Sequence, residues 1–185
     1  AQKDPSFVVR EEAINIIGAL NKEKYKNDFI NWTKDSSYTI AGAALEALDA
    51  IDSVTAYQLA QAASKVPIKK RLNTVVTKLL TKYGDESEFD FIANKYESLN
   101  NQSEEKFQMT QPFAALLMKT KNADKFKRGI EIIVAFRESI PAQYRTQTDP
   151  YFNAKVLGEI LKVKKQNGEN ELVKVVTAVL PMLIK

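Results

Sequence analysis

Pairs of neighbouring carboxylates are the residues of this chain whose type and spacing would best suit chemistry, because acid–base catalysis uses carboxyl groups held close together. Three pairs fit this description: Glu11 with Glu12, Glu86 with Glu88, and Glu104 with Glu105. A catalytic carboxyl also needs an apolar pocket that perturbs its pKa, and no pattern around these pairs indicates one. Charged side chains without such a pocket lie on the surface. We therefore interpret the three pairs as solvated surface.

Histidine and cysteine, the residues that most often build metal sites and nucleophilic sites, are both absent from the 185 residues. Their absence removes the usual zinc ligands, the usual base at neutral pH and any disulfide. The six glycines are scattered, so there is no glycine-rich phosphate loop, and no G-x-S-x-G motif occurs. The sequence predicts no catalytic, cofactor-binding or metal-binding residue in this chain.

Basic side chains give the chain a net charge of +4 and gather in four clusters. The clusters are Lys22-Lys24-Lys26, Lys69-Lys70-Arg71, Lys119-Lys121-Lys125-Lys127-Arg128 and Lys162-Lys164-Lys165. Acidic residues lie among them on what should be solvent faces. Lysine also outnumbers arginine, which is preferred for forked phosphate contacts. The composition therefore argues against a nucleic-acid partner.

No stretch approaches the roughly 20 apolar residues that cross a bilayer, so no membrane span is expected. No helical pattern combines a basic face with an exposed aromatic edge, which argues against a membrane surface as partner. The compartment stays open, since a chain without cysteine suits a reducing cytoplasm and a periplasm equally.

A helical pattern that occurs twice, 31 residues apart, organises the first third of the chain. The segment 4–20, DPSFVVREEAINIIGAL, returns at 35–51 as DSSYTIAGAALEALDAI. The matched pairs are Asp4/Asp35, Ser6/Ser37, Phe7/Tyr38, Val9/Ile40, Ala13/Ala44, Ile14/Leu45, Ile17/Leu48 and Leu20/Ile51. Their apolar members are three and four residues apart, which predicts one buried helix face shared by both copies. A weaker third copy keeps Val75, Val76 and Leu79 in phase but has Val66 in place of the aspartate.

Start signals and apolar spacing place the individual helices of the two copies. Asp4 is expected to cap a helix whose first residue is Pro5 and which runs to about Leu20. A second helix carries the aromatic row Tyr25, Phe29 and Trp32, which we interpret as core. Small residues crowd the second copy, from Ala41 to Ala63, and predict helices packed closely between neighbours.

Helices continue after the loop SLNNQSEE, without the 31-residue phase. Pro112 either leads the next helix or kinks one that begins near Glu104. Asn122 opens another helix. The segment 141–150, PAQYRTQTDP, is expected to be a long connection whose last residues, Asp149 and Pro150, open a further helix. Gly168 separates it from a last helix that reaches Leu183 and is kinked or frayed at Pro181.

These patterns predict an all-α fold: a HEAT-like α-solenoid, a right-handed superhelix of antiparallel helical hairpins with about ten helices. The chain is expected to be one domain, 1–185, and a piece of a larger protein. Its parts would be regular repeats at 4–33 and 35–64, a degenerate repeat at 66–99 and an irregular helical tail at 104–185.

Three groups of residues also carry a family resemblance. The opening D-P-S-x-x-V-R-x-x-A-x-x-x-I-G-x-L is supplied by Asp4, Pro5, Ser6, Val9, Arg10, Ala13, Ile17, Gly18 and Leu20. It resembles a HEAT-type repeat. Together with Y-x-I-x-G-x-A-L from Tyr38 and F-x-x-G-I from Phe126, it resembles the C-terminal domain of bacterial zinc aminopeptidases of the aminopeptidase N family. Ala41 stands where a second repeat arginine would be, so no regular Asp–Arg ladder between repeats is expected.

The resemblance implies a role without chemistry for this piece. In that family a separate catalytic domain binds zinc through H-E-x-x-H and a further glutamate, so the zinc would belong to the parent enzyme. The C-terminal helical domain covers the catalytic domain and limits access of long peptides. The expected partner is the preceding catalytic domain of the same polypeptide, and a peptide substrate is a candidate for the concave face. The alternative is a stand-alone HEAT-repeat scaffold that binds a protein or peptide in that face.

The N-terminal end of the first copy adds one expectation. Phe7, Val8 and Val9 are three apolar residues in a row, and terminal units of a helical stack need a cover for their apolar ends. We expect the preceding domain to cover this end.

Overall fold

The computed structural model describes residues 4–20 and 23–180 of the chain. Every regular element within these ranges is helical: eleven α-helices, two short 3-10 helices and one π-helix. The prediction of an all-α chain with about ten helices is therefore confirmed. The chain separates into two compact units, Ala1–Tyr83 and Gly84–Lys185. Their border lies inside 66–99, the segment predicted as a degenerate repeat, and the single domain 1–185 stays a prediction.

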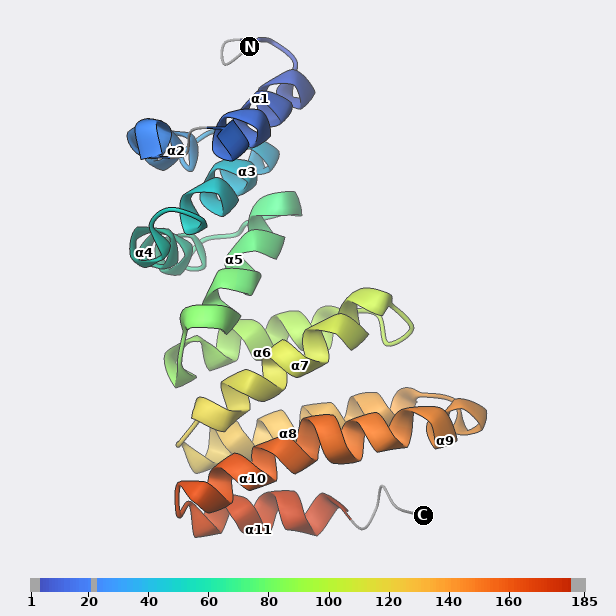
Figure 1. Ribbon diagram of the computed structural model, residues 1–185. Helices are drawn as coiled ribbons and strands as arrows, with labels where there is room; N and C mark the ends of the chain where they lie inside the picture. Colours follow the sequence, from blue (N-terminus) through green and yellow to red (C-terminus); the bar gives the residue numbers. More distant parts are fainter. Residues whose placement is uncertain (1–3, 21–22, 181–185) are drawn as a thin grey trace. The chain divides into compact units, whose positions relative to one another are not determined.

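The first unit arranges its helices in two layers. The helices are α1 Phe7–Leu20, α2 Lys26–Trp32, α3 Tyr38–Asp49, α4 Ser53–Ala63 and α5 Lys70–Tyr83, with a 3-10 turn Glu23–Tyr25 before α2. One layer holds α1, α3 and α5, with α3 between the other two, and the second holds α2 and α4 (Figure 1). Segments 4–33 and 35–64 therefore each contribute one helix to each layer.

The two copies of the sequence pattern begin their helices in the same way. The Asp4 carboxylate accepts a hydrogen bond from the Ser6 N–H at 2.9 Å, and the Asp35 carboxylate accepts one from the Ser37 N–H at 2.8 Å. Because this turn takes up two residues after each aspartate, the helices begin at Phe7 and Tyr38. The prediction that Pro5 is the first helical residue was wrong, since Pro5 lies in the turn.

Helix α3 is the central element of this unit and packs against α1, α2, α4 and α5. Its small residues make this possible: every residue from Ile40 to Leu45 is buried. A Cβ placed on Gly42 would lie only 2.7 Å from the backbone nitrogen of Leu72 in α5. The prediction that the small residues of the second copy pack between neighbours is confirmed.

The remaining core of the unit follows the predicted faces. Phe29 of the aromatic row is fully buried and meets the half-buried Trp32 edge to face, with ring centroids 5.6 Å apart. On α5, the residues in phase with the repeat, Val75, Val76 and Leu79, are all buried. The face of the degenerate copy is therefore a buried face.

The second unit consists of helices around an aromatic core. After a 3-10 turn Glu86–Glu88 come α6 Phe89–Ser98, α7 Glu104–Lys119, α8 Ala123–Ser139, α9 Ala142–Pro150, the π-helix Tyr151–Leu157, α10 Gly158–Gln166 and α11 Asn170–Val179. Helix α7 contacts α6, α8 and α10, and α11 contacts α8 and α10. Tyr96 stacks on Phe113 at 4.9 Å, and its hydroxyl shares a hydrogen bond of 2.7 Å with Thr110. Burial raises the pKa of this phenol.

The starts of helices α7 and α8 can be compared with the predictions. Helix α7 begins at Glu104, where the Ser103 hydroxyl accepts the Lys106 N–H at 3.2 Å, and Pro112 lies inside it. The helix start agrees with the second of the two alternatives for Pro112. Asn122 caps α8 as predicted, accepting the N–H groups of Asp124 and Lys125. The predicted kink or fraying at Pro181 and the predicted end of the last helix at Leu183 lie outside the described residues.

The segment 141–150 is not a connection, which corrects the prediction. It forms α9 and runs through the π-helix into α10, so the chain is helical from Ala142 to Gln166. The wider π turn follows directly after Pro150, whose ring cannot donate a helical hydrogen bond. Asp149 opens no helix but lies within α9, and its carboxylate receives two hydrogen bonds from Arg137, at 2.8 and 2.6 Å. This long-range pair is invisible in the local sequence.

Candidate functional site

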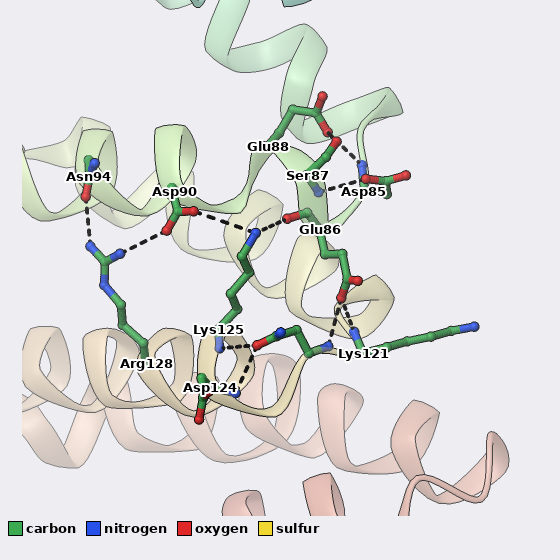
Figure 2. Close-up of polar contacts among 11 residues, drawn as sticks. Asp85, Glu86, Ser87, Glu88, Asp90, Asn94, Lys121, Asp124, Lys125 and Arg128 are labelled. Carbon is green, nitrogen blue, oxygen red and sulfur yellow. Dashed lines mark hydrogen bonds and ion pairs between the residues drawn. The ribbon is translucent and has the colours of Figure 1, made fainter.

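A polar cluster of the second unit includes one of the carboxylate pairs considered for catalysis (Figure 2). The Glu86 carboxylate accepts the N–H groups of Lys121 and Asn122 at 2.7 and 2.8 Å. These hydrogen bonds hold the pKa of Glu86 below its usual value. A general acid at neutral pH needs the opposite shift. Glu86 therefore stays ionised and ties the loop before α8 to the start of α6.

Glu88, its partner in sequence, is buried, so the prediction of solvated surface was wrong for this residue. It forms a capping box: its carboxylate accepts the Asp85 N–H at 3.2 Å, while Asp85 accepts the Ser87 N–H at 2.8 Å. The Ser87 hydroxyl also donates to Glu88 at 2.7 Å. The spacing of Asp85 and Glu88 was a signal that the sequence offered for this arrangement.

Two side chains of the basic cluster at 119–128, Lys125 and Arg128, pair with Asp90 of α6 (Figure 2). Lys125 donates to the Glu86 carbonyl at 3.0 Å and lies 3.6 Å from Asp90. Arg128 bonds Asp90, Asn94 and Glu97 at 3.3, 2.8 and 2.6 Å. These side chains join α8 to α6, so their contacts serve the fold and give no support to nucleic-acid binding.

Lys164 corrects the interpretation of another basic cluster. It is fully buried, and its ammonium donates to the carbonyls of Met118 and Thr120 at 3.1 and 2.6 Å while pairing with Glu169 at 2.6 Å. It thereby satisfies the carbonyls at the C-terminal end of α7. Its place four residues after the buried Ile160, and so on the same side of α10, could have indicated this. Lys22 of the first cluster lies outside the described residues.

The other two carboxylate pairs have different surroundings. Glu11 is half-buried and pairs with Arg71, which also reaches Glu46 at 2.9 Å. Glu104 and Glu105 are exposed, as predicted. Within 4–20 and 23–180, no group of three or more Asp and Glu side chains could hold a metal ion. No helix in the same ranges is long and apolar enough to span a membrane.

The outer side of α1 is the feature that points to a function. Large apolar side chains are exposed along it: Phe7, Val8, Val9, Ile16 and Leu20. Val9, Ala13, Ile16 and Leu20 are four, three and four residues apart and therefore form one stripe, which we call the α1 outer stripe. Ile16 is 50% exposed and Leu20 81% exposed. A contiguous exposed apolar stripe on a helix is a candidate interaction site.

The equivalent side of α3 is covered, and α1 is what covers it. Ile40, the counterpart of Val9, is only 2% exposed and lines a small cavity together with Arg10 and Ile14 of α1. A Cβ placed on Gly18 of α1 would lie 3.2 Å from the Cβ of Ala47, the counterpart of Ile16. The predicted shared face is thus buried on α3. On α1 the prediction was correct for Ile14, which is buried, and wrong for Phe7, Val9 and Leu20, which are exposed.

An ion pair completes the contact between the two helices. Arg10 of α1 lies 3.6 Å from the carboxylate of Asp35, which precedes α3. Asp4 occupies the corresponding position before α1, and among the described residues no cation pairs with it. The α1 outer stripe and Asp4 form the candidate docking site. No protein-family model, no curated protein and no solved structure matches this chain.

Proposed function

We propose that this chain is a non-catalytic helical-repeat domain that docks on another protein domain through the outer side of α1. The observation that carries the proposal is the α1 outer stripe, which is exposed while its counterpart on α3 is packed. More specifically, we propose a HEAT-like, right-handed superhelical domain at the C-terminal end of a zinc aminopeptidase. It would pack on the preceding catalytic domain and limit the access of long peptides.

Three positions of the family-like motifs have packing roles that support this proposal. Arg10 pairs with Asp35, as expected for a contact between neighbouring repeats. Gly18 lets α1 approach Ala47 of α3, and Gly129 lets α8 approach the Leu117 side chain of α7. These three motif residues therefore serve contacts between helices. The second copy has Ala41 in place of an arginine, so the Arg10–Asp35 pair is not repeated from that position.

In this proposal zinc and the catalytic base belong to the preceding domain. The purified chain should then hold no stoichiometric zinc after dialysis and cleave no aminoacyl reporter, because it has neither the ligands nor the base. Metal analysis and a turnover assay check this. Zinc retained through dialysis, together with turnover, would show that the carboxylates of this chain do chemistry.

The parent reading frame gives the first test. A frame that contains H-E-x-x-H and a later glutamate upstream of Ala1 supports the aminopeptidase proposal. A frame that starts near Ala1 would favour the stand-alone scaffold that binds a protein or peptide in its concave face.

The second test adds the purified catalytic portion to this chain. Docking suppresses local opening, so hydrogen exchange at the amides from Phe7 to Ala13 should slow. The catalytic portion should also lose activity on long peptides but keep it on a short aminoacyl reporter. Protection at α11 instead, or nowhere, would contradict the proposed orientation.

A further inference from the structure

We infer that the α1 outer stripe binds one protein α-helix that reproduces the inner face of α1. That helix would carry an arginine, an aliphatic residue four positions later and a glycine or other small residue eight positions later. Its arginine would pair with Asp4. The inference rests on the proposed function in one respect, that a protein domain covers α1, and it adds the chemistry of the contacting helix.

The internal repeat supplies the template. Position by position, the α1 outer stripe corresponds to Ile40, Ala44, Ala47 and Ile51 of the second copy. On that copy, Ile40 faces Arg10 and Ile14, and Ala47 faces Gly18. Two helices with equivalent apolar spacing present equivalent ridges and grooves. The helix that suits the stripe is therefore one whose inner side resembles that of α1.

The charge at the start of α1 points to the same partner. Asp4 and Asp35 both hold the N–H of the serine two residues later, so their carboxylates are oriented alike. Asp35 receives Arg10 from the preceding helix. Asp4 has a half-exposed carboxylate in the corresponding place. An arginine at the first position of the partner pattern would reach it as Arg10 reaches Asp35.

The composition of the stripe also favours a protein helix. Its four members are aliphatic, and the charged residue that borders them is Glu12, which is exposed. A negative charge beside the apolar residues disfavours an anionic lipid surface. A helix laid into a stripe with spacing of four, three and four buries every member at once.

The test lengthens the chain by one repeat. An extra copy of residues 4–34 is joined directly before Asp4 of the full chain, which keeps the natural 31-residue spacing. Amide exchange of the resident Val9 to Leu20 segment should slow by about ten-fold or more, because the added helix covers it. The matched control carries Ile14→Asp and Gly18→Leu in the added copy only, which should abolish the slowing.

Substitutions in the resident helix locate the contact. Ile16→Glu should leave the exchange of the natural chain unchanged, since the side chain is exposed, and should remove the protection in the lengthened chain. Asp4→Asn in the resident copy and Arg10→Gln in the added copy should each reduce the protection several-fold. Together they should reduce it no further than either does alone.

Other results would overturn the inference. Unchanged exchange in the lengthened chain, with the added copy helical by circular dichroism, would show that the stripe does not accept such a helix. Dimerisation of the natural chain that Ile16→Glu abolishes would make a second copy the occupant. The test needs no catalytic portion, so its failure is distinct from failure of the proposed function, which would appear as no protection of α1 by that portion.

Discussion

Helices α1 and α3 carry the same sequence pattern and the same opening turn, yet their apolar stripes have different surroundings. The stripe of α3 is covered by α1, and the opposite side of α3 contacts α5 (Figure 1). Among the described residues, no helix covers the α1 outer stripe, so Val9 is 43% exposed while Ile40 is 2% exposed. A repeated apolar pattern therefore specifies which side of a helix can be buried. Whether that side is buried depends on the element next to it.

The largest difference between the two helices should appear at Leu48 and Ile17, which are equivalent in sequence. Leu48 is fully buried and Ile17 is half-buried. Leu48→Ala should lower the free energy of unfolding by roughly 2–5 kcal/mol, and Ile17→Ala by about half as much or less. Urea unfolding followed by the fluorescence of Trp32, the single tryptophan, measures the first unit. Equal losses at both sites would contradict the difference in burial.

The contact of α3 with α5 gives the next effect. Gly42→Ala would place a Cβ 2.7 Å from the Leu72 nitrogen and 2.8 Å from the Arg71 carbonyl carbon, so the backbone must shift. We expect a loss of about 1–3 kcal/mol in the same assay. Glu11→Ala, at the equivalent position of α1, is the matched control and should cost under about 1 kcal/mol, because it removes only a half-exposed ion pair with Arg71. If Gly42→Ala leaves the free energy of unfolding unchanged, α3 and α5 lie farther apart than these distances.

The ion pair between Arg10 and Asp35, which joins the two copies, should contribute less to the free energy of unfolding. Arg10 and Asp35 are partly exposed, so their coupling energy in a double-mutant cycle of Arg10→Gln and Asp35→Asn should be about 0.5–1 kcal/mol. Asp4→Asn and the same Arg10 variant should show no coupling in the natural chain. Coupling between Asp4 and Arg10 would show that Arg10 pairs within its own copy.

Acid should weaken the ion pair between α2 and α4, the two helices of the second layer. Lys26 of α2 pairs with Asp52, the N-cap of α4, at 2.7 Å, and the hydrogen bonds from Lys26 and Thr55 lower the pKa of Asp52. A carboxyl with a lower pKa in the folded chain stabilises it fully above its unfolded pKa, about 3.9, and this contribution is lost as the pH falls through the folded value. Asp52→Asn should therefore reduce the acid sensitivity of stability below about pH 4. If Asp52→Asn leaves the loss of stability in acid unchanged, the ion pair between Lys26 and Asp52 does not persist in solution.

The smallest effect should come from the α1 outer stripe in the natural chain. Ile16→Ser should change the free energy of unfolding by less than about 0.5 kcal/mol, as is usual for surface substitutions, because half of the side chain is already exposed. Ile40→Ala on α3 should cost roughly 2–5 kcal/mol. A large loss at Ile16 would mean that another part of the chain covers the stripe.

Much of the local structure could be predicted from spacing. The helical class and the Asn122 cap follow from neighbours within a few positions. The close packing of α3 was indicated by its small residues, and the repeat by comparing segments 31 residues apart. Helix starts were predicted less well, because an Asp-x-Ser turn takes up two residues before the first helical bond. Pro5 therefore lies outside the helix.

The candidate site was predictable only in part. The apolar run Phe7 to Val9 indicated an end that needs a cover, but the exposure of Ile16 and Leu20 depends on where α3 lies. Lys164 looked like solvent-facing charge, although its partners are the carbonyls of Met118 and Thr120, more than forty positions earlier.

By itself the sequence determined the helices, their apolar sides and the absence of histidine and cysteine, because these depend on residue type and on spacing of three and four. Only the tertiary structure decided that Asp149 lies within a continuous helix and pairs with Arg137, and that α1 keeps one apolar stripe exposed. A hydrogen bond along a helix joins residues four apart. Burial and ion pairing join residues that are distant in sequence, and these contacts exist only once the helices have packed.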